Sequence, residues 1–254
     1  MVYTPTAPAL VAARHELGSG LARAGTERAL SRERTYDVEA LRPDGSVTRR
    51  SLGAPATPAF EAAFSAVARG TLIATTRGQV AVEDLAPGMK LVTNERGPSP
   101  LMWIGAMTLP PRPAGRDGDT RLIRVMADAF GIGRPMPDFL TGPGARILKR
   151  NGAQADMVLT PFLDLVDGNG VVAVNPPSPV RLFHLGLRRH ATITAAGLTI
   201  ESFHPGPGFE RQMTAAMLER FMAFFPHLAR PSEFGPLAHP RQPLGSAGGQ
   251  SDVA

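Results

Sequence analysis

From residue 70 to about residue 203, turn residues divide the chain into short apolar segments. Candidate strands lie at 72–75, 80–82, 91–92, 101–104, 121–126, 146–148, 157–160, 171–174, 180–187 and 191–203. The 27 glycines and 25 prolines show no short period, so they indicate frequent chain reversals rather than a fibrous repeat. Short strands at close, regular spacing are typical of barrels and sandwich-like folds. We therefore predict an all-β fold.

The first 57 residues are predicted to be an N-terminal extension that contains a hairpin. Short helices are expected at 9–17 and 27–34. Apolar Tyr36, Val38 and Ala40 then alternate with acidic residues, and the segment 42–45 ends in the glycine that a tight turn needs. The β domain is expected to occupy residues 58–205.

After residue 205 the apolar period changes from two residues to about four. Phenylalanine and methionine side chains between Phe209 and Phe225 recur at helical spacing, with charged residues on the opposite side. This pattern predicts an amphipathic helix within 206–229 whose apolar face docks on the β domain. The remaining segment, 230–254, ends in small polar residues and is predicted to be partly disordered.

Composition excludes several classes of function. Arg49–Arg50 and Arg188–Arg189 are basic pairs without interleaved aromatic residues, so nucleic-acid binding is not expected. The chain has no cysteine, hence no disulfide or thiol nucleophile, and its histidine spacing suggests no metal or cofactor site.

No apolar run is long enough for a transmembrane segment, and no N-terminal signal peptide is readable. A cytoplasmic location, or secretion by a non-Sec route, is the expectation.

A family resemblance rests on an ordered series of short motifs. They are Gly70-Thr71-Leu72-Ile73, then Val82-Glu83-Asp84-Leu85 with Pro87-Gly88, and finally Trp103-Ile104-Gly105. A later segment, 182–203, continues the match. The series resembles the Hint (hedgehog/intein) domain in its bacterial variant. The resemblance implies a compact, horseshoe-like β fold and autocatalytic cleavage of a peptide bond.

Self-cleavage requires a side-chain nucleophile and a group that donates a proton to the departing nitrogen. In the Hint family these are a cysteine, or less often a serine, four residues before the first glycine, and a histidine in a later strand. The corresponding positions here are Ala66 and Ala145. A methyl group can neither attack a carbonyl nor carry a proton. The resemblance therefore predicts a degenerate site and a protein that is not an enzyme.

Four other residues are residual site candidates. Ser65 is adjacent to the vacated position, but in an extended chain it faces the opposite side, and we expect a solvated turn serine. Thr141 is expected to cap a strand or bond locally. His184 and His190 are either relics of a proton-transfer site or one packed and one surface histidine; we favour the second interpretation.

The resulting hypothesis is a scaffold or binding module whose target, a peptide or protein, is unknown. Two alternatives stay open at this point. One is an active autoprocessing domain that uses Ser65 in place of cysteine. The other is a secreted adhesion-type β module.

Overall fold

The structure is a computed structural model, and it describes residues 33–111, 122–150 and 156–243. Within these ranges it contains fifteen strands: β1 Glu33–Leu41, β2 Val47–Pro55, β3 Val67–Ala68, β4 Leu72–Thr75, β5 Gly78–Ala81, β6 Lys90–Thr93, β7 Gly97–Leu109, β8 Leu122–Val125, β9 Phe139–Thr141, β10 Arg146–Arg150, β11 Met157–Pro161, β12 Val171–Val174, β13 Val180–Leu187, β14 Thr192–Ala195 and β15 Leu198–Glu201. The described helices are α2 Pro58–Phe64, α3 Ala215–Met222 and four 3-10 turns: η1 Val82–Asp84, η2 Phe162–Leu165, η3 Phe209–Gln212 and η4 Pro231–Phe234. The all-β prediction is confirmed.

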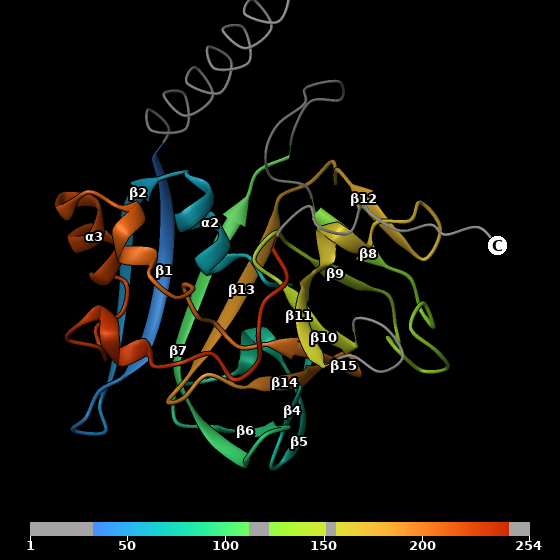
Figure 1. The fold of residues 1–254 in the computed structure, drawn as a ribbon, viewed down its shortest axis with the longest axis horizontal. Coiled ribbons are helices and arrows are strands. Elements are labelled where there is room, and N and C mark those ends of the chain that lie inside the picture. Colours follow the sequence, from blue (N-terminus) through green and yellow to red (C-terminus); the bar gives the residue numbers. More distant parts are fainter. Residues whose placement is uncertain (1–32, 112–121, 151–155, 244–254) are drawn as a thin grey trace, which may run out of the picture.

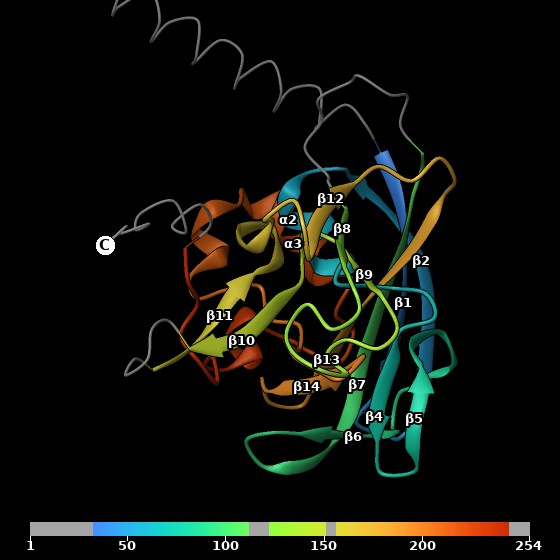
Figure 2. The ribbon, with the colours of Figure 1, turned by 90° about the vertical axis from the view of Figure 1, so that its right-hand side faces the viewer.

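Twelve of the strands form one continuous antiparallel path, in the order β11-β10-β15-β14-β4-β6-β7-β13-β3-β9-β8-β12, and β1, β2 and β5 pair beside it. Figures 1 and 2 show how this path bends: the long strands β7 and β13 run through the middle, and the short strands β4, β6 and β14 turn away from them. β7 has 13 residues and pairs with β6 at one end and with β1 and β13 at the other. It therefore joins the two parts of the molecule.

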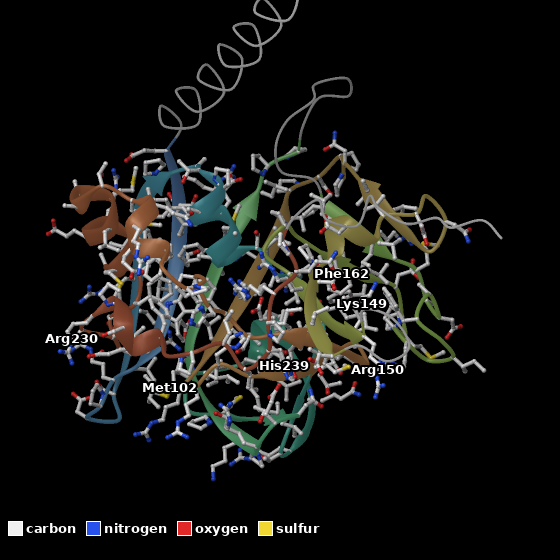
Figure 3. All side chains as sticks on the ribbon, viewed as in Figure 1. Met102, Lys149, Arg150, Phe162, Arg230 and His239 are labelled. Atoms are coloured by element: carbon white, nitrogen blue, oxygen red, sulfur yellow. The ribbon has the colours of Figure 1, made fainter. Side chains whose placement is uncertain are left out.

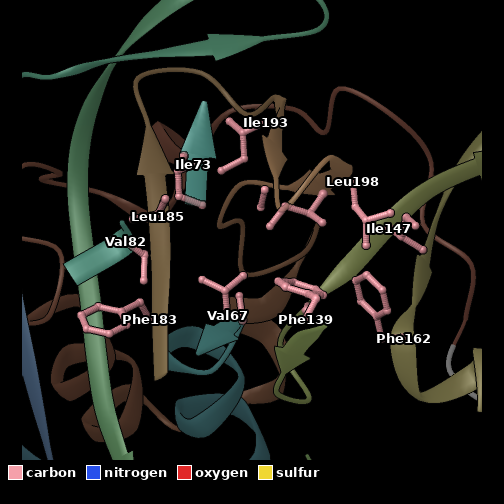
Figure 4. Close-up of a cluster of buried hydrophobic side chains, with 14 of the residues drawn as sticks. Val67, Ile73, Val82, Phe139, Ile147, Phe162, Phe183, Leu185, Ile193 and Leu198 are labelled. Atoms are coloured by element: carbon pink, nitrogen blue, oxygen red, sulfur yellow. The ribbon is translucent and has the colours of Figure 1, made fainter. Parts of the chain in front are cut away.

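The first core lies inside the bent sheet and is aliphatic (Figure 4). Ile73, Leu91, Leu101 and Leu198 are fully buried in it, with Phe139 and Phe162 at one side. Burial alternates along β4 and β6, so every second side chain of these strands points into the interior. Ala66 and Ala145 belong to this core and directly precede β3 and β10.

The second core is aromatic and contains the N-terminal hairpin. β1 pairs with β2 and, by its other edge, with β7, so the hairpin continues the sheet. Tyr36 of β1 packs on Phe64 of α2, with ring centroids 4.5 Å apart, and Phe64 packs on Phe224 at 5.1 Å. The indole Nε1–H of Trp103 donates to the carbonyl of Phe224 at 2.7 Å. Hairpin, α2 and C-terminal segment thus share one core, on the left in Figure 1.

The helix predicted within 206–229 is shorter than the apolar period indicates. Gly208 has φ +70°, and Thr214 caps a new helix by accepting the N–H of Met217 through its side chain. These two interruptions leave the turn η3 and the eight-residue α3 instead of one helix. The predicted docking of the apolar face is confirmed, because Phe209 and Phe221 are both buried in the aromatic core.

The start of the segment predicted to be partly disordered has a defined path. Gln242 donates its N–H to the carbonyl of Leu159, and Leu159 donates to that of Pro240, so this stretch lies along β11. Figure 3 shows His239 of the same stretch over the middle of the molecule, whereas Arg230 lies at its outer surface. The expected helix at 9–17 and nearly all of that at 27–34 lie outside the described residues; Glu33 and Arg34 belong to β1.

Candidate functional site

The peptide bond between Ser65 and Ala66 lies in the interior, between the end of α2 and the start of β3. Ser65 is 0% exposed and Ala66 is 2% exposed. Ala66 donates its N–H to the carbonyl of Phe183 on β13, at 3.0 Å. Its carbonyl accepts the N–H of Gly142 at 3.0 Å and the hydroxyl of Thr141 at 2.5 Å. The segment is therefore held on both sides by strands distant in sequence.

The segment that carries Ala145 is a hydrogen-bonded neighbour of Ser65. Gly144 donates its N–H to the carbonyl oxygen of Ser65 at 3.0 Å, and Ala145 follows directly, 2% exposed. Ala66 and Ala145 belong to the same buried cluster. The structure thus brings together two positions separated by 79 residues of chain.

Close packing explains the two glycines between Thr141 and Ala145. A Cβ at Gly142 would lie 2.4 Å from the carbonyl oxygen of Ser65, and one at Gly144 would lie 2.2 Å from that of Ala62. Both distances are far below van der Waals contact, so only glycine allows this approach. The turn presses its backbone directly against the last turn of α2.

Ser65 is not the solvated turn serine that the sequence predicts. It ends α2, and its hydroxyl oxygen is buried with no hydrogen-bond partner among the described residues. Burial follows from the contacts of α2 with β7 and β13, which sequence spacing does not show. A serine nucleophile needs an adjacent base within hydrogen-bond reach, and the described residues supply none to this hydroxyl.

Thr141 bonds across the sheet as well as locally. Its hydroxyl donates to the carbonyl of Ala66, which is 75 residues away in sequence, and lies 3.3 Å from the carbonyl of Gly142. The threonine side chain therefore fixes the segment that would contain the nucleophile in a Hint domain. A donor held in this position also means that the carbonyl of Ala66 is fully satisfied in the folded protein.

His184 is buried on β13, next to the residue that pairs with Ala66. Its Nδ1 lies 3.1 Å from the carbonyl oxygen of Ala62, so Nδ1 carries the proton and donates it. Nε2 is then unprotonated, and it has no partner among the described residues. Burial lowers the pKa of His184 to about 4. The side chain is a neutral base at physiological pH.

His190 is buried as well, which corrects the expectation of a surface histidine. Its Nδ1 accepts the N–H of Ala238 at 2.8 Å, so Nε2 carries the proton and donates it to Glu201 at 2.9 Å. The C-terminal stretch covers this position, and nothing in the local sequence around His190 indicates that cover. Burial alone would raise the pKa of Glu201, but the His190 hydrogen bond and the charges of Arg241 and Arg146 lower it to about 2.

Four residues of this polar cluster were not predicted as site residues: Arg146, Glu201, His204 and Arg241. Arg241 donates Nε–H to Glu201 at 2.8 Å and an Nη2–H to the carbonyl of His204 at 2.6 Å. Arg146 reaches the other oxygen of Glu201 at 3.6 Å. Glu201 lies inside the matched segment 182–203 and Arg146 follows the aligned position Ala145, which was a usable signal. Arg241 is 40 residues beyond Glu201 in the C-terminal stretch, where no local pattern marks it.

His204 completes the cluster as a neutral side chain. Its Nδ1 accepts the N–H of Gly206 and its Nε2 donates to the carbonyl of Gly235, both at 2.9 Å. Burial lowers its pKa to about 4. Among the residues that the structure describes, no group of three or more histidine, cysteine or acidic side chains is arranged to hold a metal ion. None of the described helices is long and apolar enough to span a bilayer.

Comparison with known proteins agrees with this geometry. A family model described as the Hint domain matches residues 65–207, which is more than half of the chain. The chain belongs to the Hint domain family, so the family resemblance is confirmed. The match begins at Ser65, and the hairpin and α2 lie before it.

The chain is also similar in structure to three solved proteins of low sequence identity. They are the bacterial intein-like domain from Clostridium thermocellum (14% identity, TM-score 0.33, 55% of this chain and 99% of that one), a mutant of the Ssp DnaB mini-intein variant M86 (13%, 0.30, 54% and 90%), and a splice-inactive variant of the AceL NrdHF class 3 split intein (10%, 0.33, 55% and 98%). No curated protein matches the sequence.

Proposed function

We propose that this protein is a Hint domain that has lost self-cleavage and acts as an intact scaffold or binding module. The observation that carries the proposal is the pair Ala66 and Ala145, on two segments joined by backbone hydrogen bonds. An alanine at each position removes both the nucleophile and the proton donor. Ser65 is not supported as a replacement nucleophile, because its hydroxyl has no hydrogen-bonded base among the residues that the structure describes.

The residues upstream of Ala66 support the same conclusion. In an active domain of this kind, cleavage before residue 66 would release the segment that precedes it. Here that segment supplies Tyr36, Phe60 and Phe64 to the aromatic core, all of them 0% exposed. Arg34 and Glu61 of the same segment form a buried ion pair at 2.8 Å. The upstream segment is thus built into the fold, and an intact chain is the form that the packing stabilises.

Intact-mass measurement tests the proposal. The purified chain, incubated with dithiothreitol or hydroxylamine, is expected to keep its mass of 26.9 kDa. Both reagents intercept the ester or thioester that a nucleophile at residue 65 or 66 would form with a carbonyl carbon. Spontaneous appearance of two fragments, divided next to Ser65, would refute the loss of cleavage and favour the serine alternative.

A reversal tests the assignment of the two positions. The double variant Ala66→Cys and Ala145→His restores a thiol and an imidazole on neighbouring segments. We expect partial cleavage between residues 65 and 66 that depends on the reagent, and none in either single variant. Tryptophan fluorescence of buried Trp103 reports whether each variant is folded. A folded double variant that stays intact would count against the assignment of these positions.

A further inference from the structure

A cavity of about 490 Å³ lies beside the vacated site, and its lining changes character from one end to the other. Its apolar wall comes from α2, η3 and α3 and includes Phe60, Phe209, Met213, Met217 and Phe221. Its polar end is formed by Arg146, His184, His204 and Arg241. This volume, with mostly apolar walls and a few converging polar groups, is typical of small-molecule sites.

The polar end carries more positive than negative charge. Arg146 and Arg241 share one buried carboxylate, Glu201, whose first oxygen already accepts from both Arg241 and His190. Arg146 contacts the second oxygen at the long distance of 3.6 Å. Burial and the charge of Arg241 lower the pKa of Arg146, and the charges of Glu201 and Asp164 oppose this only in part. An anion at this end would relieve the repulsion between the two guanidinium groups.

Among the residues that the structure describes, two buried polar atoms at the same end have no partner. They are Nε of Arg146, which is a donor, and Nε2 of His184, which is an acceptor because Nδ1 holds the proton. Only the first of them matches a carboxylate, which accepts hydrogen bonds and has no proton to donate to Nε2 of His184. A carboxyl group fits this end, since its oxygens accept from arginine in a planar, paired geometry.

We propose that this cavity binds an amphipathic monocarboxylic acid. The carboxylate lies against Arg146 and Arg241, and the alkyl or aryl part lies along Phe209, Met213 and Met217. The inference rests on the proposed function, because it assigns a ligand to the binding module. A carboxylate brings one negative charge to the two arginines that line this end, whereas a phosphate monoester would bring a second negative charge close to Glu201.

Calorimetric titration of the full chain with octanoate tests the proposal. We expect saturable binding of one molecule, at least tenfold weaker binding of 1-octanol, which has the same chain without the charge, and no tighter binding of octyl phosphate. Arg146→Met is expected to weaken octanoate binding at least tenfold. The matched control Arg77→Met, at an exposed turn, is expected to leave it unchanged. Met217→Trp, which fills the apolar side from α3 and leaves the charges in place, is expected to weaken both octanoate and octanol.

Three results would overturn the assignment. They are no saturable binding of octanoate by folded protein, equal affinity for octanoate and octanol, or equal affinities of the Arg146→Met and Arg77→Met variants. If octyl phosphate binds more tightly than octanoate, the proposal of a carboxylate ligand is wrong, and the site prefers a different anion. The intact mass of the same sample separates the two proposals. An intact chain that does not bind octanoate refutes only the ligand, and a cleaved chain refutes the loss of self-cleavage.

Discussion

Acid is expected to destabilise this protein well above the pKa of its carboxylates, because it buries neutral histidines. His184 and His204 are 5% and 6% exposed. Burial lowers the pKa of each from the ordinary histidine value of about 6.5 to about 4. Protonation therefore favours the unfolded chain, whose histidines bind protons more readily. These histidines do not reduce the free energy of unfolding above pH 6.5, and they reduce it progressively as the pH falls from 6.5 towards 4.

The magnitude follows from the difference between the two pKa values. Between pH 7 and pH 5, a histidine that titrates near 6.5 unfolded and near 4 folded removes about 2 kcal/mol of unfolding free energy. His184 and His204 together remove about 4 kcal/mol. His227, whose pKa burial also lowers to about 4, acts in the same direction but is only half-buried. Glu201, with a pKa lowered to about 2, contributes mainly below pH 4.5.

Urea unfolding at a series of pH values, followed by the fluorescence of Trp103, measures this loss. The variants His184→Gln and His204→Gln are each expected to be less stable at pH 7 but to lose about 2 kcal/mol less than the wild type between pH 7 and pH 5. The change in unfolding free energy between pH 7 and pH 5 reports the titration of the histidine, whereas the unfolding free energy at pH 7 also includes the packing lost in the variant. A wild-type stability that is flat over this range, or variants with the same fall as the wild type, would refute the reasoning.

Two further predictions concern the segments around Ala66 and Ala145. Gly144→Ala places a Cβ 2.2 Å from the carbonyl oxygen of Ala62, so we expect a loss of about 1–3 kcal/mol and a clear drop in the thermal midpoint. Gly53→Ala meets only ordinary contacts, the nearest at 3.7 Å, and is the matched control; equal midpoints would contradict the packing argument. Ser65→Ala removes a buried hydroxyl that has no partner, so it is expected to leave stability equal or higher in urea unfolding; a loss above about 1 kcal/mol would show a partner that the structure lacks.

The strand pattern and the order of the motifs were sufficient to predict the fold. Local turn signals predicted most of the strands from β4 to β13, but not the short strand β9, and they left β14 and β15 as one segment, 191–203. The helix within 206–229 was predicted too long, because apolar period alone does not show where Gly208 and the Thr214 cap interrupt it. Localisation, and the hypothesis of a peptide or protein partner, stay predictions of the sequence.

The sequence by itself determined that the chain has no thiol, because it contains no cysteine, and it led to the proposal that Ala66 and Ala145 replace the nucleophile and the proton donor. Only the tertiary structure decided the environment of the remaining polar groups. Ser65 and His190 are buried because α2 and the C-terminal stretch pack over them, and Arg241 reaches Glu201 across 40 residues. Side-chain identity is local information, whereas burial and pairing depend on segments that approach one another only after folding.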